Sequence, residues 1–309
     1  MNITVWGDNP ATPFKEGFAQ NEIFTFRVWD AQEEKVRKGF VEYKSGSNKF
    51  MNGATSELSK LVTSETQQIV LSMGWNLNST YIIPDNPNMT DLLGAYSNSI
   101  VIVKNLKGSV YIPQYGINNI GDWNYKEGYQ IYMNKAETIE ITGEASTPEN
   151  DKIGLNAGWS YVSYLRSTQK DCETALNSLT SNASLLIAKN KAGQTYIPSF
   201  NINTIGNMLP GQGYQMYLTK KDTLIYPANS LGRAGIGNIT PTPEFLTPIY
   251  KETGNSSVAI LQINLPNGDE IGVYNQNDEL IGSGVVHNGF AAVTIWGDND
   301  QTDETDGAK

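Results

Sequence analysis

The chain has 309 residues, of which 17 % are charged, and its formal net charge at pH 7 is −10. Nucleic acids and anionic membrane surfaces select clusters of Lys and Arg, which this sequence lacks, so we expect neither as a partner. No apolar run reaches the ~18 residues of a transmembrane helix, so we expect no membrane insertion. One cysteine and one histidine exclude an internal disulfide framework and His₂ or Cys₄ zinc sites.

The first part of the chain, residues 1–62, predicts short β-strands separated by turns. Residues 3–6, 23–29 and 40–43 alternate apolar and polar side chains, which is the period of a half-buried strand. Residues 44–64 are polar and contain Gly, Ser and Asn, so we expect a loop or linker there. We interpret residues 1–62 as the back half of a β-sandwich module.

The central part is a tandem duplication. The first copy reads GWNLNS at 74–79, VYIP at 110–113 and GYQIYM at 128–133, and the second reads GWSYVS at 158–163, TYIP at 195–198 and GYQMYL at 213–218. The offset is 84 residues at the tryptophans (75 to 159) and 85 from Tyr-Ile-Pro onward (110 to 195), so one inserted residue separates the copies. A duplication this regular predicts one fold made twice, by residues 63–146 and 147–229.

Each repeat is expected to be a small α+β unit made mainly of strands. A short helix is predicted near 89–96, with its counterpart at 172–179. An apolar strand follows each helix, at 100–103 or 185–188, and a turn containing Gly then leads into Tyr-Ile-Pro as a hairpin.

The last part, residues 230–309, is interpreted as a linker and the front half of a β-sandwich module. Residues 228–248 are rich in Pro and Gly, as expected of a linker or an extended arm. Closely spaced short strands are expected after it, at 258–263, 270–274, 280–286 and 291–296.

A second self-similarity links the two ends of the chain. VTIWGDN at 293–299 matches ITVWGDN at 3–9, an offset of 290 residues, and Thr302 and Gly307 also have counterparts at that offset. We expect one period of a larger array, divided inside a β module. The predicted fold class is therefore mainly β, with β-sandwich-like end modules flanking two tandem small α+β repeats.

Two frames carry a resemblance to a known group of proteins. GWNL…GYQIYM (74–133) and DEIGVY…TIWGD (269–298) resemble repeats common in large secreted proteins of Bacteroidota, which often leave the cell through the type IX secretion system. The second repeat departs from the frame, with Met208 where the first has Trp123. The resemblance implies an extracellular or cell-surface module without catalytic activity.

The acidic C-terminal segment raises the question of calcium. Calcium takes six to eight oxygen ligands, and this segment offers the carboxylates of Asp298, Asp300, Asp303 and Asp306. The matching N-terminal loop keeps fewer of these acids, which favours the alternative of a solvated surface loop. No other cofactor is expected.

Two aromatic residues are candidates for glycan binding. Trp123 and Tyr125 lie in a polar stretch, where exposed rings would stack on sugars. The aromatic residues at repeated positions, such as Trp75 and Tyr129, are expected to build the cores instead.

No catalytic constellation stands out, so we expect no enzyme. A glycosidase needs two carboxylates, but Asp122 and Glu127 of the first repeat become Asn207 and Gln212 in the second. The sequence contains no Gly-x-Ser-x-Gly elbow and no phosphate loop. A Cys–His dyad would require Cys172 to meet His287; we expect a partly buried helix residue and a turn residue.

Together these patterns predict a non-catalytic structural or adhesive segment of a long secreted, modular surface protein. The alternative is a carbohydrate-binding module of an extracellular protein. The expected partners are neighbouring modules of the same protein or of another copy, with glycans as the second class. Because each end half alone would expose an apolar face, we expect residues 1–45 to pack with residues 256–297, within one chain or head to tail between chains.

Overall fold

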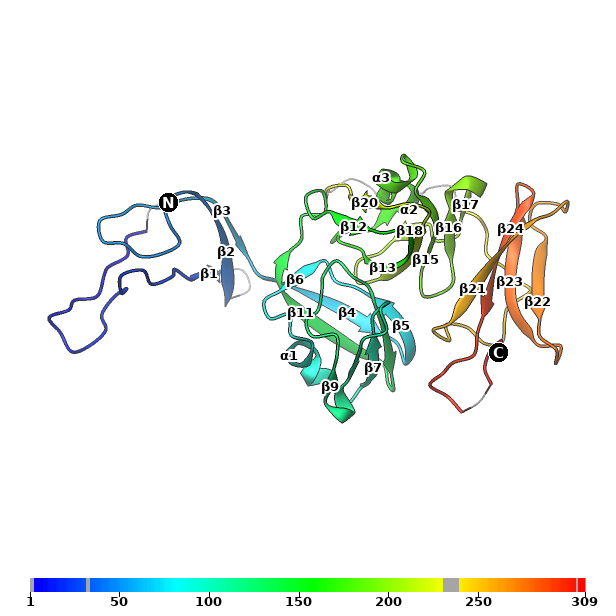
Figure 1. Ribbon diagram of the computed structural model, residues 1–309, viewed down its shortest axis with the longest axis horizontal. Helices are drawn as coiled ribbons and strands as arrows, with labels where there is room; N and C mark the ends of the chain where they lie inside the picture. The colour runs from blue at the N-terminus through cyan, green and yellow to red at the C-terminus, as the bar shows by residue number, and fades with distance from the viewer. Residues whose placement is uncertain (1–2, 32–33, 230–238, 304, 309) are drawn as a thin grey trace. The chain divides into compact units, whose positions relative to one another are not determined.

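The computed structural model describes residues 3–31, 34–229, 239–303 and 305–308. The chain divides into two compact units, residues 1–65 and residues 66–309, and each is described by itself. The predicted mainly β class is confirmed, because antiparallel sheets are the main regular structure of both units and the helices are few and short (Figure 1).

The first unit contains one three-stranded antiparallel sheet in the order β1-β2-β3. Its strands are β1 (Phe26–Asp30), β2 (Lys35–Ser45) and β3 (Glu57–Thr63). The expected loop at 44–64 is wrong in its second half, because residues 57–63 pair with β2. The expected strand at 3–6 is also wrong, since those residues have no ladder partner and only Gly7 forms a bridge, with Phe18.

The first repeat is built around a five-stranded sheet in the order β5-β10-β7-β8-β9. Its strands are β5 (Gly74–Asn78), β7 (Ile100–Lys104), β8 (Val110–Ile112), β9 (Ile117–Asn118) and β10 (Tyr129–Met133). A second sheet, in the order β4-β11-β6, contains β4 (Glu65–Leu71), β6 (Ile82–Pro84) and β11 (Glu137–Ala145).

The second repeat has the same five-stranded order, β13-β19-β15-β16-β17. Its strands are β13 (Gly158–Ser163), β15 (Leu185–Lys189), β16 (Thr195–Ile197), β17 (Ile202–Asn203) and β19 (Gly213–Leu218). Two-stranded pairs are formed by β12 (Ile153–Leu155) with β20 (Asp222–Leu224) and by β14 (Lys170–Asp171) with β18 (Asn207–Met208). A β-bulge falls at equivalent places in the two five-stranded sheets.

Short helices occupy matching places in the repeats. In the first repeat α1 (Met89–Leu93) continues as η1 (Gly94–Tyr96), and in the second α2 (Cys172–Ala175) precedes α3 (Asn177–Thr180). The side chains of Asn88 and Asp171 accept backbone N–H groups of the first turn, which is why these helices begin where they do. The single turns η2 (Pro113–Tyr115) and η3 (Pro198–Phe200) follow Tyr-Ile in each copy.

The two repeats contact each other reciprocally. Asn78 of the first bridges Gln212 of the second, and Glu127 of the first bridges Val162 of the second. Asn78 and Val162 are equivalent positions, as are Glu127 and Gln212, so each repeat offers the same two edges to the other. This is the pattern of an isologous interface, which closes on itself and does not propagate. The two repeats therefore form a closed pair, in which an edge of each repeat covers the equivalent edge of the other.

The C-terminal sheet has four antiparallel strands in the order β21-β24-β23-β22. They are β21 (Ser256–Gln262), β22 (Glu270–Tyr274), β23 (Leu280–His287) and β24 (Phe290–Trp296). Val258, Ile260 and Phe290 on one face pack with Ile187 and Ile197 of the second repeat. The sheet therefore lies against the second repeat, as Figure 1 shows.

The two self-similar ends form the same loop. Gly7 bridges Phe18 at the N-terminal end, and Gly297 bridges Ala308 at the C-terminal end, again 290 residues apart. Asp8 and Asp298 play the same part, since a carboxylate oxygen of each accepts a backbone N–H eight residues later, at 2.7 Å and 2.8 Å. We call these segments the N-terminal loop (7–18) and the C-terminal loop (297–308).

Candidate functional site

The candidate site is the junction between the repeats and the C-terminal sheet, where polar and aromatic side chains gather. It centres on two equivalent Trp–Lys pairs, Trp75 with Lys104 and Trp159 with Lys189. Each tryptophan stands opposite a tyrosine of the neighbouring strand, with ring centroids 5.1 Å apart in the first repeat and 5.3 Å in the second. The lysine Nζ lies over the indole, 4.2 Å and 5.5 Å from the ring centroid.

The first pair receives the C-terminal loop. The indole Nε1 of Trp75 donates a hydrogen bond to Oδ1 of Asn299 at 2.9 Å. Lys104 Nζ forms an ion pair with Asp300 at 3.3 Å. Gly254 lies flat against the Trp75 ring at φ +84°, where a Cβ would come within 2.6 Å of the indole. Its carbonyl accepts a hydrogen bond from Gln130 at 2.8 Å. Trp75 therefore contacts both the backbone at Gly254 and the side chain of Asn299.

The second pair holds the start of the C-terminal sheet. Lys189 Nζ donates to the backbone oxygen and to Oγ of Ser256, both at 3.0 Å. Burial lowers the pKa of Lys189 to about 8. Nearby, Thr294 donates to the carbonyl of Gly193 at 2.6 Å, and the Trp296 ring lies against Gly193, where there is no space for a Cβ. Of the two equivalent lysines, Lys104 therefore contacts the C-terminal loop and Lys189 contacts the first residue of the sheet.

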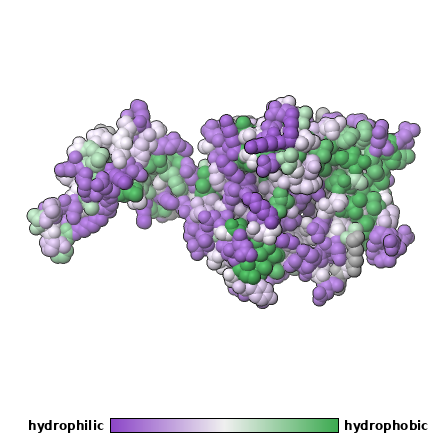
Figure 2. Space-filling view, in the orientation of Figure 1, coloured by the Kyte–Doolittle hydropathy of each residue, from purple (hydrophilic) through white to green (hydrophobic). Residues whose placement is uncertain are grey.

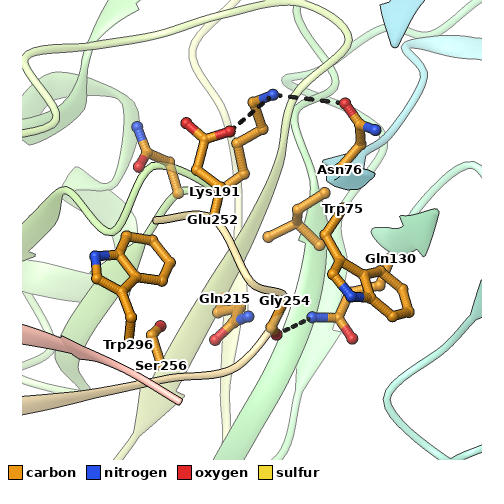
Figure 3. Close-up of a pocket in the computed structure, with 11 residues that line it drawn as sticks. Trp75, Asn76, Gln130, Lys191, Gln215, Glu252, Gly254, Ser256 and Trp296 are labelled. Carbon is orange, nitrogen blue, oxygen red and sulfur yellow. Dashed lines mark hydrogen bonds and ion pairs between the residues drawn. The ribbon is translucent and has the colours of Figure 1, made fainter. Parts of the chain in front are cut away.

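Figure 3 shows the small pocket that lies between these contacts. Lys191 lies 3.3 Å from the carboxylate of Glu252 and 3.5 Å from the side-chain oxygen of Asn76 (Figure 3). Trp75 and Trp296 line the pocket, but each has only 5 % of its surface exposed. A sugar needs an open aromatic face to stack on, and neither indole offers one. The residues of this pocket instead connect the repeats to the C-terminal part of the chain.

The expected glycan platform at Trp123 and Tyr125 is not exposed. Trp123 is 2 % exposed and packs on Tyr129, with ring centroids 4.4 Å apart. Tyr125 is half-buried against the core of the second repeat, and its hydroxyl donates to Asp151 at 2.8 Å. Burial raises the pKa of both Tyr125 and Tyr129, in the latter case to about 12. The polar sequence around these rings reflects turns that cover them, because the side chains themselves fill the core.

The four acidic residues of the C-terminal loop do not converge. Asp298 and Asp306 accept backbone N–H groups within the loop, at 2.8 Å and 2.7 Å. Asp300 pairs with Lys104, and Asp303 is exposed. Within the described residues, no group of three or more His, Cys, Asp or Glu side chains could hold a metal ion. Asp298 and Asp306 stabilise the loop, and Asp300 attaches it to the first repeat.

Cys172 and His287 have separate structural settings. Cys172 is fully buried in the core of the second repeat, more deeply than expected, and burial raises the pKa of its thiol. His287 ends β23, where its Nε2 lies 3.1 Å from the side-chain nitrogen of Asn288. Reasoning from sequence did not identify the junction. One available signal was that Lys104 and Lys189 recur at the same offset as the repeat frame.

The comparisons with known proteins returned nothing: no family model, curated protein or solved structure matches the chain. Among the helices that the structure describes, none has both the length and the apolar character needed to cross a membrane.

Proposed function

We propose that this chain is a non-catalytic structural or adhesive segment of a long secreted, modular surface protein. The observation that carries the proposal is the junction, where Trp75 and Lys104 of the first repeat hold the C-terminal loop and Lys189 of the second repeat holds the start of the C-terminal sheet. Such contacts hold the first repeat, the second repeat and the C-terminal sheet together as one rigid element. A segment that resists bending is what an extended surface protein requires between its attachment and its partner.

The site chemistry supports this role over an enzymatic one. The charged groups at the junction are paired with each other, as in Lys104 with Asp300 and Lys191 with Glu252. The most deeply buried of the lysines, Lys189, donates to Ser256. Secretion and surface location rest on the resemblance of the repeat frames to secreted Bacteroidota proteins. The 290-residue self-similarity supports a larger array.

Hydrogen exchange on the full chain tests the rigid junction. We expect the amides of residues 254–256 and 296–299 to be protected as strongly as those in the repeat cores, because these segments contact Trp75 and Lys189 of the repeats. The variant Trp75→Ala should lose that protection, whereas Trp123→Ala, in the first-repeat core, should weaken that core first. Rapid exchange at the junction of the unaltered chain would contradict the proposal.

The second candidate, a carbohydrate-binding module, is favoured by one specific residue. Trp159 keeps 44 % of its surface exposed on β13, so its free ring surface could stack on a sugar. A glycan array decides between the two: binding that disappears in Trp159→Ala but survives in Trp6→Ala, which alters another exposed tryptophan, would establish a glycan-binding site. Absence of binding by the unaltered chain leaves the structural role.

A further inference from the structure

We propose that the three-stranded sheet of one copy of this chain covers the open face of the four-stranded C-terminal sheet of a second copy, completing a seven-stranded β-sandwich between them. This inference rests on the proposed structural role and names the partner, which is another copy of the same segment. The two sheets are called the head sheet (β1–β3) and the tail sheet (β21–β24).

The tail sheet has one face that only its own residues line. The face turned away from the second repeat forms an apolar cluster drawn entirely from the sheet and its margin: Ala259, Leu261, Ile263, Ile271, Val273, Val286, Ala291, Val293 and Ile295. Val286, Ala291 and Val293 at its centre are buried by their neighbours, and the other six are half-buried. Figure 2 shows hydrophobic residues gathered over these strands. None of the nine is charged.

The head sheet has a matching apolar face. Directly paired residues point to the same side of a sheet, so Phe26, Val28, Val41, Tyr43 and Leu61 share one face. Arg37 reaches this face at the end of the ladder, where its guanidinium donates to the carbonyl of Ser64.

The opposite face of the head sheet carries the charged residues Arg27, Lys38, Glu42 and Lys60 interleaved with Trp29, Val36, Phe40 and Val62, so it is the more highly charged of the two faces. An antiparallel sheet normally packs its less charged face on a second layer.

The head unit contains little that could serve as that layer. Among the described hydrophobic residues of 1–65, Phe50 alone is buried, in a small aromatic group with Phe18 and Phe24. This group reaches only the first residue of the apolar face, through the contact of Phe24 with Phe26. Leu61 on the apolar face remains 45 % exposed. The apolar face of an antiparallel sheet is normally covered by a second layer, so we expect the head sheet to pack on a partner.

The self-similar loops identify the tail sheet as that partner. At the C-terminal loop, the tail sheet comes directly before the loop. At the N-terminal loop, which has the same bridge and the same Asp-held turn, the head sheet comes directly after the loop. The four-stranded tail sheet thus precedes the C-terminal loop, and the three-stranded head sheet follows the N-terminal loop. The two sheets are consecutive halves of one kind of module, and two such sheets pack face to face about 10 Å apart.

The contact is heterologous, because the head surface differs from the tail surface. One molecule therefore leaves a free head and a free tail for further copies, and the assembly grows end to end. Residues 3–6 of the arriving copy match a strand segment that β24 already provides. They stay outside the completed sandwich, in agreement with their lack of ladder partners in the chain.

Two variants of the full chain test the pairing. Leu61→Arg blocks the head, and Ile271→Arg blocks the tail, each placing a charge on an apolar face that is not fully buried. We expect the unaltered chain to grow in mass with concentration in multi-angle light scattering. Each variant alone should remain at 34.0 kDa. An equimolar mixture should stop at twice that mass, because only one head and one tail remain intact.

Matched controls alter the other faces of the same sheets. Val36→Arg lies on the more highly charged side of the head sheet and Tyr274→Arg on the repeat-facing side of the tail sheet, both at exposed positions. These variants should assemble like the unaltered chain. Circular dichroism checks that all four variants keep their strands. If Ile271→Arg fails to fold, Leu261→Arg replaces it on the same face.

Two results would overturn the pairing. The first is an unaltered chain that stays monomeric up to about 1 mM, because a Kd above that concentration corresponds to only about −4 kcal/mol of association free energy. A monomer whose stability falls on either blocking mutation would instead show closure within one chain. The second is growth that neither blocking variant stops. The glycan array and the junction exchange experiment are independent of assembly, so failure here leaves the proposed structural role to be judged by them.

Discussion

The N-terminal and C-terminal loops have nearly the same sequence and the same internal turn but different surroundings. Trp6 before the N-terminal loop is 77 % exposed, whereas Trp296 at the same position before the C-terminal loop is 5 % exposed. Residues 293–296 belong to β24, which pairs with β21, but residues 3–6 form no ladder. The comparison teaches that the turn is encoded locally, by Asp and Gly, while the strand exists only where a partner strand is supplied.

The largest effect should come from truncating the two tryptophans. Trp296→Ala removes a buried ring at the junction and should lower the free energy of unfolding of residues 66–309 by about 3–5 kcal/mol. Trp6→Ala changes an exposed ring and should cost less than about 0.5 kcal/mol. Urea titration of both variants measures the difference. Equal losses would show that the N-terminal copy is buried in solution.

The next largest loss of stability is expected at Asn299, compared with its counterpart Asn9 in the N-terminal loop. Asn299→Ala leaves the buried indole N–H of Trp75 without an acceptor and should cost about 1–3 kcal/mol. Asn9→Ala loses only a turn contact with the backbone of Ala11 and should cost about 0.5 kcal/mol. Thermal unfolding followed by tryptophan fluorescence separates the two. A loss at Asn9 as large as at Asn299 would mean that the N-terminal loop also docks on an indole.

The third prediction concerns the pH dependence of stability at Lys189, which holds the start of the C-terminal sheet and, among the described residues, has no counterpart contact at the N-terminal loop. Burial lowers the pKa of Lys189 to about 8 from its ordinary 10.5. Between these values the unfolded chain holds a proton that the folded chain has lost, so the stability contributed by this group rises with pH. The difference in unfolding free energy between the unaltered chain and Lys189→Met should therefore change by about 2–3 kcal/mol from pH 8 to pH 10.5. A constant difference would place Lys189 in contact with water.

The smallest effect is expected at the edge of the junction. Asp300→Ala removes the ion pair with Lys104, and because the aspartate side chain is 55 % exposed the loss should be about 0.5 kcal/mol. The effect should vanish in 1 M salt, where exposed charges are screened. The N-terminal loop has Pro10 at this position, so it lacks the ion pair by sequence. A loss that persists in high salt would indicate a packing role for Asp300.

The sequence by itself determined the repeated features, because these depend on local or short-range physics. The duplicated frame predicted the two repeats, and both have one strand order with equivalent helices and turns. The 290-residue self-similarity predicted related ends, and the shared bridges at Gly7 and Gly297 follow from the same turn residues.

Other features were decided only by the tertiary structure. Polarity near Trp123 suggested exposure, but its burial depends on turns that cover it. Residues 57–63 pair because β2 lies beside them, and the acids of the C-terminal loop meet backbone N–H groups and Lys104 instead of one another. The hydrogen bond between Trp75 and Asn299 joins residues 224 positions apart. Such contacts leave no periodic signal in the sequence, because a side chain's partner at that separation is set by the packing of whole sheets.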